Sequence, residues 1–370
     1  MRRRAAGLPV LGLVLAVSAL LGGRARAQTQ PERYFYFGQD YGSQALYSPW
    51  WVFINRSFDV LQDHVADRNI FKLEYRHNAA NVLRNLADPF PAIRDRGWSR
   101  FIKQEILPLD FTDHGARWMP NYGLHLIGGG MTYSALREWY EDHQVPWPRV
   151  WSALTVMASA LVNETIENKN VRGYNTDAIA DLYVFDLGGI LLFSFDAVNR
   201  LFSRHMIMSD WSLQPSITLP RGELHNHGNY FAIKWPLPFY PRLRLFTWFG
   251  EATTGGLSLK VNREYSVSFA AGGAATRILN QATNRVENVV TFEPTGVVFL
   301  DRNESLLASL QVSDMPDYFI HLNVYPHALS PHGPRVGFWT VMDKQARVSL
   351  GVTFALLGFG PGISSIGRGY

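Results

Sequence analysis

Residues 119–130 read MPNYGLHLIGGG and open an apolar stretch, residues 119–204, around which the chain is organised. Two further motifs follow within it, LVNETIE at residues 161–167 and TDAIADL at residues 176–182. Together the three motifs place one histidine and four carboxylates among apolar neighbours. Polar groups in apolar surroundings cost free energy unless they are paired or ligated. The pattern therefore predicts either a satisfied polar network or a functional site.

Helical periodicity predicts three helices in this stretch. They are expected at residues 121–142, 150–167 and 176–202, with a break at Pro146-Trp-Pro148 between the first two. Asn175 or Thr176 is expected to cap the start of the third helix.

The carboxylates fall in pairs that share a helix face. Glu164 and Glu167 are three residues apart, and Asp177 and Asp181 are four apart. His125 is followed by glycines at positions 128 and 129, which would let another helix approach closely. We therefore expect the three helices to bring their polar faces together.

Three interpretations follow for these side chains. In the first, a divalent metal is bound by an imidazole and several carboxylates, the candidate ligands being His125, Glu164, Glu167, Asp177 and Asp181. In the second, one carboxylate and His125 form a general acid–base pair without a metal, and the candidate catalytic residues are His125, Glu164 and Asp181. In the third, the groups form a structural network that holds a helical bundle together.

Some of these residues also have a purely structural explanation. Asp177 is an acid in the first turn of a helix, where the helix dipole favours it, and His125 is equally explained as a satisfied core histidine. Asp186 and Asp196 lie on other parts of the third helix and are expected to be solvated. The apolar stretch at residues 119–204 has no Glu-x-x-His pair, and the sequence has no Gly-x-Ser-x-Gly motif, no phosphate loop and no cysteine. It therefore identifies no nucleophile.

After His205 the hydrophobic period changes to two. Apolar residues alternate with small or polar ones in five segments, at residues 257–262, 265–270, 306–313, 318–325 and 347–356. This alternation predicts strands, and the small polar face is typical of the inside of a barrel whose apolar face meets lipid. We expect an outer-membrane β-barrel of roughly eight to ten strands between residues 210 and 357, with a soluble sandwich or lipocalin-like barrel as the alternative.

The first residues have the pattern of an export signal. Three arginines at positions 2–4 precede an apolar run over residues 5–21 and the small-x-small site Ala25-Arg-Ala27, so we expect a signal peptide over residues 1–27. Removing its five arginines leaves 30 basic and 31 acidic residues, a net charge of −1 in place of +4. The charge of the chain therefore supports no nucleic-acid partner.

The motifs of the helical stretch also carry a family resemblance. Residues 118–130, 163–167 and 177–189 resemble an uncharacterised family of Gram-negative envelope proteins. The order of histidine, glutamate and aspartate before a glycine-containing helix is similar to that of VanZ-like proteins. The resemblance covers about residues 115–205 and implies a place in the cell envelope. VanZ-like proteins place their helices in the inner membrane, which does not suit a chain with a strand-rich C-terminal half. Neither family supplies a reaction.

The expected architecture is α+β, a helical bundle followed by an antiparallel barrel. The segments are the signal peptide, a helical and irregular segment at residues 28–118, a helical core at residues 119–204 and an outer-membrane barrel at residues 205–370. The expected function is a structural or gating role in the outer membrane, with lipid as the partner. The alternative is an envelope enzyme that acts on a lipid or cell-wall component, with or without a divalent metal.

Overall fold

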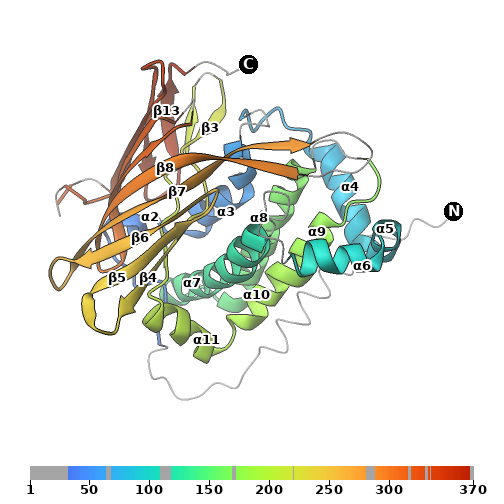
Figure 1. Ribbon diagram of the computed structural model, residues 1–370, viewed down its shortest axis with the longest axis horizontal. Helices are drawn as coiled ribbons and strands as arrows, with labels where there is room; N and C mark the ends of the chain where they lie inside the picture. Colours follow the sequence, from blue (N-terminus) through green and yellow to red (C-terminus); the bar gives the residue numbers. More distant parts are fainter. Residues whose placement is uncertain are drawn as a thin grey trace. The chain divides into compact units, whose positions relative to one another are not determined.

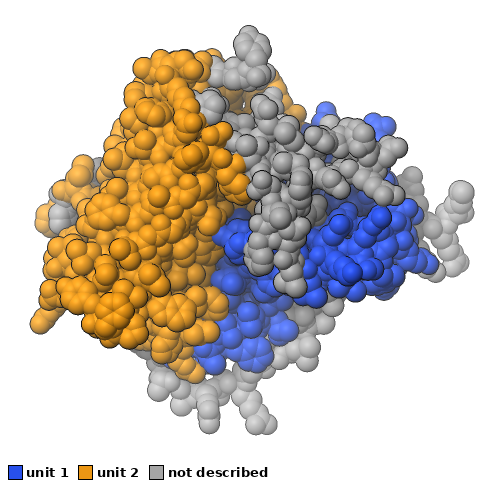
Figure 2. All heavy atoms as spheres, viewed as in Figure 1, with its two compact units in different colours: residues 1–36, 74–199 blue, residues 37–73, 200–370 orange. Residues whose placement is uncertain are grey.

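The structure, a computed structural model, describes residues 32–63, 68–108, 118–168, 172–219, 221–280, 288–315, 318–329, 332–333 and 335–366. The expected signal peptide, residues 1–27, lies outside the described residues. Two compact units divide the chain, one comprising Met1–Tyr36 and Glu74–Asn199 and the other Phe37–Leu73 and Arg200–Tyr370 (Figure 2). The first unit is helical and the second contains a large sheet, which confirms the predicted α+β class.

Helices make up most of the described part of the first unit (Figure 1). In chain order they are α4 (Tyr75–Ala87), α5 (Pro89–Arg96), α6 (Trp98–Phe101), η2 (Ile102–Ile106), η3 (Met119–Gly128), α7 (Gly129–Asp142), α8 (Pro148–Glu167), α9 (Asp177–Ala180), η4 (Asp181–Asp186), α10 (Leu187–Leu192) and α11 (Asp196–Arg200). Three of these segments, η2, η3 and η4, are π-helical. Helices α7, α8 and α10 pack together, and their buried faces form the core of this unit.

The expected helices are present, with one difference. Segments η3 and α7 run on from each other over residues 119–142, and α8 covers the second predicted helix. The third predicted helix is broken after Leu192, because the side-chain amide of Asn199 donates to the carbonyl of Phe193 at 2.8 Å and fixes a turn there. Among the described residues no single helix is long and apolar enough to cross a membrane, although the bent pair Asp177–Leu192 and Asp196–His205 passes by length and composition together.

Strands make up most of the second unit. They are β1 (Ser209–Asp210), β2 (Ser216–Thr218), β3 (Glu223–His225), β4 (Phe231–Leu237), β5 (Tyr240–Phe249), β6 (Ala252–Lys260), β7 (Tyr265–Asn280), β8 (Asn288–Arg302), β9 (Ser305–Ser313), β10 (Ile320–Val324), β11 (Val336–Met342), β12 (Val348–Phe354) and β13 (Gly360–Ser364). Their order in the sheet is β1-β4-β5-β6-β7-β8-β9-β10-β11-β12-β13-β2-β3. Every pair is antiparallel except β13 with β2, which is parallel.

This sheet differs from the predicted barrel in two respects. It has 13 strands among the described residues, more than the eight to ten expected. The sequence does not reveal β1, β2 and β3, which are only two or three residues long, or β13, whose sequence GPGIS has no alternation of apolar and polar residues. The paired strands also form an open sheet with β1 and β3 at its ends, so a closed barrel is not observed. The β1–β4 pair and the β2–β3 pair are separated by a break in regular pairing. The break lies near Pro215, which has no amide N–H, and near Gly228, whose φ is +143°.

The two faces of the sheet are opposite in character. Leu257, Phe269 and Leu310 project from one face and are 41–57% exposed. Their neighbours along the strands, such as Ser258 and Ser268, are fully buried on the other face. The predicted alternation is therefore present, with the polar residues inside and the apolar residues outside.

The polar face is covered by the N-terminal segment of the same unit. Helices α2 (Gly42–Leu46) and α3 (Pro49–Ser57) lie on one side of the sheet (Figure 1). α2 packs beside β9, and η1 (Asp59–Asp63) packs beside β7. The indole of Trp51 and the amide of Asn55 both donate to the carbonyl of Leu213, and Asn55 accepts from the backbone N–H of Gly228. These hydrogen bonds attach the segment to residues 209–230.

Candidate metal centre

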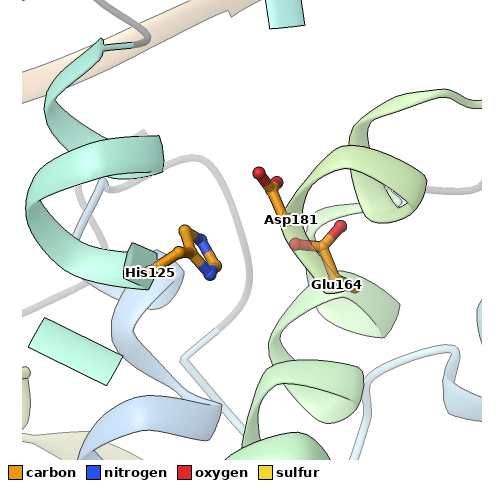
Figure 3. Close-up of side chains that lie close together, drawn as sticks. All are labelled: His125, Glu164 and Asp181. Carbon is orange, nitrogen blue, oxygen red and sulfur yellow. The ribbon is translucent and has the colours of Figure 1, made fainter. Parts of the chain in front are cut away.

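His125 lies on the π-helical segment η3 and is held by a buried carboxylate. Its Nδ1 is 3.1 Å from Oδ2 of Asp186, which is fully buried on η4. An aspartate that accepts from Nδ1 leaves Nε2 with its lone pair, as in histidines that bind metals. Figure 3 shows the imidazole on the side of η3 that faces Glu164 and Asp181.

Glycines bring α10 close to the continuous helix formed by η3 and α7. A Cβ on Gly130 would lie 2.3 Å from the ring of Phe193 and 2.7 Å from the carbonyl oxygen of Gly189. A Cβ on Gly189 would lie 2.4 Å from the carbonyl oxygen of Leu126. Only glycine allows backbones to approach this closely. A close approach through glycine was expected at Gly128 and Gly129, and the structure shows one at Gly130 and Gly189.

Two carboxylates complete the group around His125. Glu164 comes from α8 and Asp181 from the start of η4, and they are 1% and 5% exposed. One candidate ligand atom of each of the three residues lies within 4.8 Å of the others. Donor atoms bound to one ion at about 2.1 Å lie at most about 4.2 Å apart, so the three atoms are close to the separation that a divalent cation requires.

The remaining predicted ligands form a second, overlapping group. Glu164, Glu167 and Asp177 also offer ligand atoms that lie within 4.8 Å of one another, so Glu164 belongs to both groups. Glu167 and Asp177 are partly buried. The structure thus brings all five predicted metal ligands together within the helical unit.

The electrostatics of this cluster favour protons or cations. Burial raises the pKa of Glu164 well above its usual range, and the charges of Asp181, Glu167, Asp177 and Asp186 raise it further. Burial likewise raises the pKa of Asp181, although the neighbouring His125 opposes that shift. Within the described part of the chain, Oε1 of Glu164 and Oδ1 of Asp181 are buried and have no hydrogen-bond partner. Such oxygens are costly to bury unless a proton or a metal ion satisfies them. One imidazole with several carboxylates is a donor set that suits divalent cations.

An asparagine ladder on α4 positions the acidic residues. Asn81 donates to the side chain of Asn168 at 3.0 Å and accepts from the backbone N–H of Gly173 at 3.2 Å. Asn85 donates to the carbonyl of Gly173 and accepts from the backbone N–H of Asn175. These bonds hold the connection between α8, which carries Glu164, and α9. Asn175 also accepts from the backbone N–H of Asp177 just before α9. Of the two residues expected to cap this helix, Thr176 is the N-cap residue, but its side chain makes no capping hydrogen bond.

Sequence reasoning missed Asp186 and the asparagine ladder. Asp186 was expected to be solvated, which is wrong, because it is fully buried against His125; Asp196 is exposed as expected. Asp186 follows Asp181 by five residues, a spacing that shares a face in a π-helix but not in an α-helix. The signal for the ladder was present in the spacing of three asparagines at positions 78, 81 and 85 along one helix.

No family model, curated protein or solved structure matches the chain.

Proposed function

We propose that the helical unit binds a divalent metal through His125, Glu164 and Asp181, in a protein of the outer membrane. The observation that carries the proposal is the pair of buried carboxylate oxygens, Oε1 of Glu164 and Oδ1 of Asp181, that accept no hydrogen bond from the described residues. Both lie beside an imidazole whose Nδ1 is already engaged by Asp186. A cation at this point would satisfy both oxygens at once.

The number of protein ligands favours a catalytic metal over a structural one. Three protein ligands leave coordination positions open, as in catalytic sites, whereas structural sites are usually closed by four. A bound divalent ion would lower the pKa of a water molecule and polarise a carbonyl or phosphoryl oxygen. His125 is 16% exposed, so the centre reaches the surface of its unit on the imidazole side. We therefore propose hydrolysis of an envelope lipid or cell-wall component as the reaction class.

A structural or gating role is the second candidate. It is favoured by the near-complete burial of Glu164 and Asp181. In that case the ion would hold η3, α8 and η4 together, and its loss would lower stability without loss of any reaction.

Metal content tests the proposal directly. The purified protein is stripped with a chelator, dialysed against Mn²⁺ or Zn²⁺ and analysed for metal per chain by mass spectrometry. The His125→Ala and Glu164→Gln variants should lose metal, while His205→Ala, which changes an exposed histidine on η5 (Leu201–His205), should not. Wild-type protein that binds no more metal than His125→Ala would overturn the proposal. Incubation of wild type and Glu164→Gln with envelope lipid and peptidoglycan then separates the two roles, because only a catalytic centre yields products.

The inside-out sheet supports the membrane location. Apolar residues on the outside and polar residues on the inside are typical of membrane β-barrels and costly for a protein in water. Aromatic side chains gather at one end of the β4–β5 hairpin, where Trp235, Phe239 and Tyr240 are 49–81% exposed. Aromatic residues of this kind are enriched where a membrane protein meets the lipid–water interface.

We propose further that the sheet closes through the hairpin at residues 209–237. β1 and β2 lie on its first arm, and β3 and β4 lie on its second. Between them the backbone N–H of Trp211 donates to the carbonyl of Tyr230 at 2.9 Å, and that of Leu213 donates to the carbonyl of Gly228 at 3.1 Å. Because β2 also pairs with β13, these two bonds would complete a ring of strands. Closure would satisfy the strand edges, as lipid requires.

The absence of cysteine makes the membrane location easy to test. Leu310→Cys places a thiol on the apolar face, and Lys344→Cys places one in the exposed turn between β11 and β12. In phospholipid vesicles, brominated lipid should quench a fluorophore attached at position 310 but not at position 344. Equal quenching at the two positions would overturn the membrane location.

A further inference from the structure

The two overlapping groups of ligands are arranged around one shared carboxylate. Glu164 lies with His125 and Asp181 in one group and with Glu167 and Asp177 in the other. α8 supplies Glu164 and Glu167 from adjacent turns, and α9 with η4 supplies Asp177 and Asp181 from adjacent turns. The ligands therefore form two facing rows, with the imidazole at one end.

Glu164 has the position of a bridging ligand and a carboxylate oxygen that is available to bind a cation. It is 1% exposed, and its Oε1 accepts no hydrogen bond from the part of the chain that the structure describes. A carboxylate offers two oxygens and can bind one ion with each. Its carboxylate is the one member that both groups of ligand atoms share. A single ion on the His125 side would use only the first of the two groups.

We propose that the centre holds two divalent cations bridged by Glu164, the first with His125 and Asp181 and the second with Glu167 and Asp177. This inference rests on the proposed metal centre. The first position has a nitrogen ligand and the second has oxygen ligands alone. Imidazole suits transition metals and carboxylates suit harder ions, and Mn²⁺ accepts both donor types. In two-metal sites the ions lie about 3.5–4 Å apart and hold the attacking and leaving oxygens of a displacement.

Metal stoichiometry separates one ion from two. The full chain, stripped and then dialysed against Mn²⁺, should carry two ions per chain by metal analysis and native mass spectrometry. The double variant Glu167→Gln with Asp177→Asn should carry one, and Glu164→Gln should lose most of both. Asp196→Asn, a change at an exposed aspartate, should keep both. Circular dichroism confirms that each variant is folded, and the amide substitutions keep the side-chain shape.

Electron paramagnetic resonance detects magnetic coupling between two bound ions, which a purely structural effect of the substitutions would not produce. Two Mn²⁺ ions bridged by a carboxylate are magnetically coupled, so wild type should give a coupled spectrum and the double variant the six-line spectrum of an isolated ion. One ion per chain in wild type, with an uncoupled spectrum, would overturn the second site and leave the first. No ion at all would overturn both. Two ions with no loss in the double variant would place the second ion elsewhere and also overturn this inference.

Discussion

The direction in which stability changes with pH should depend on whether the helical unit holds a metal ion. In the unfolded chain, carboxyl groups titrate near about pH 4. Burial raises the pKa of Asp181 and Glu164 in the folded protein, so the metal-free folded state holds protons that the unfolded state has released. Stability from these groups is therefore complete below pH 4 and is lost as the pH rises towards the folded pKa. A bound cation replaces the protons and removes this loss, because metal affinity rises as ligands deprotonate.

The expected size follows from the shift itself. Each carboxyl that is protonated only in the folded state costs about 1.4 kcal/mol of stability per pH unit. For a domain of roughly 150–250 residues, this corresponds to a Tm decrease of about 3–5 °C per pH unit. Comparison of wild type with Asp181→Asn isolates the effect, since the amide cannot titrate.

Thermal unfolding followed by intrinsic fluorescence at pH 5, 6, 7 and 8 is the assay. In EDTA the Tm of wild type should fall towards that of Asp181→Asn or below it as the pH rises. In Mn²⁺ wild type should instead gain stability relative to the variant. Asp196→Asn, at an exposed position, should follow wild type throughout. Parallel profiles of wild type and Asp181→Asn in EDTA would show that Asp181 is ionised in the folded protein and would refute the reasoning.

Three further substitutions test the framework. Gly189→Ala should destabilise the helical unit by about 1–3 kcal/mol in urea unfolding, because its Cβ overlaps the facing backbone, whereas Gly255→Ala, which meets nothing within 4 Å, should be close to neutral. Asn81→Ala removes two hydrogen bonds of the ladder, and a loss of about 1–3 kcal/mol should accompany a measurable fall in metal per chain. Lys234→Met leaves Asp301, 2.7 Å from the ammonium group, buried without its partner, so a loss of about 3–5 kcal/mol is expected, and Asp301→Asn in the same chain should restore part of it.

Periodicity alone was enough to predict much of the fold. The alternation after His205 predicted strands and identified which residues share a face, because side chains of a strand must point alternately to opposite sides. Helical spacing likewise predicted the α8 pair, Glu164 and Glu167. These are local properties, set by backbone geometry within a few residues.

The short and irregular elements could not be predicted in this way. The strands β1, β2, β3 and β13 have too few residues or too little alternation to show a period, and they form because neighbouring strands offer hydrogen bonds to them. The open order of the sheet depends on the same long-range pairing.

The candidate site shows the same division. The helix positions of four carboxylates around His125 were visible in the motifs, since carboxylates are rare among apolar neighbours: Glu164, Glu167, Asp177 and Asp181. Asp186 was not, because its five-residue spacing from Asp181 has meaning only in a π-helix. The sequence by itself determined which side chains carry charge and which helix or strand face they occupy. Only the tertiary structure decided that they converge, because the close contact of Gly130 with Gly189 joins segments almost sixty residues apart in the chain.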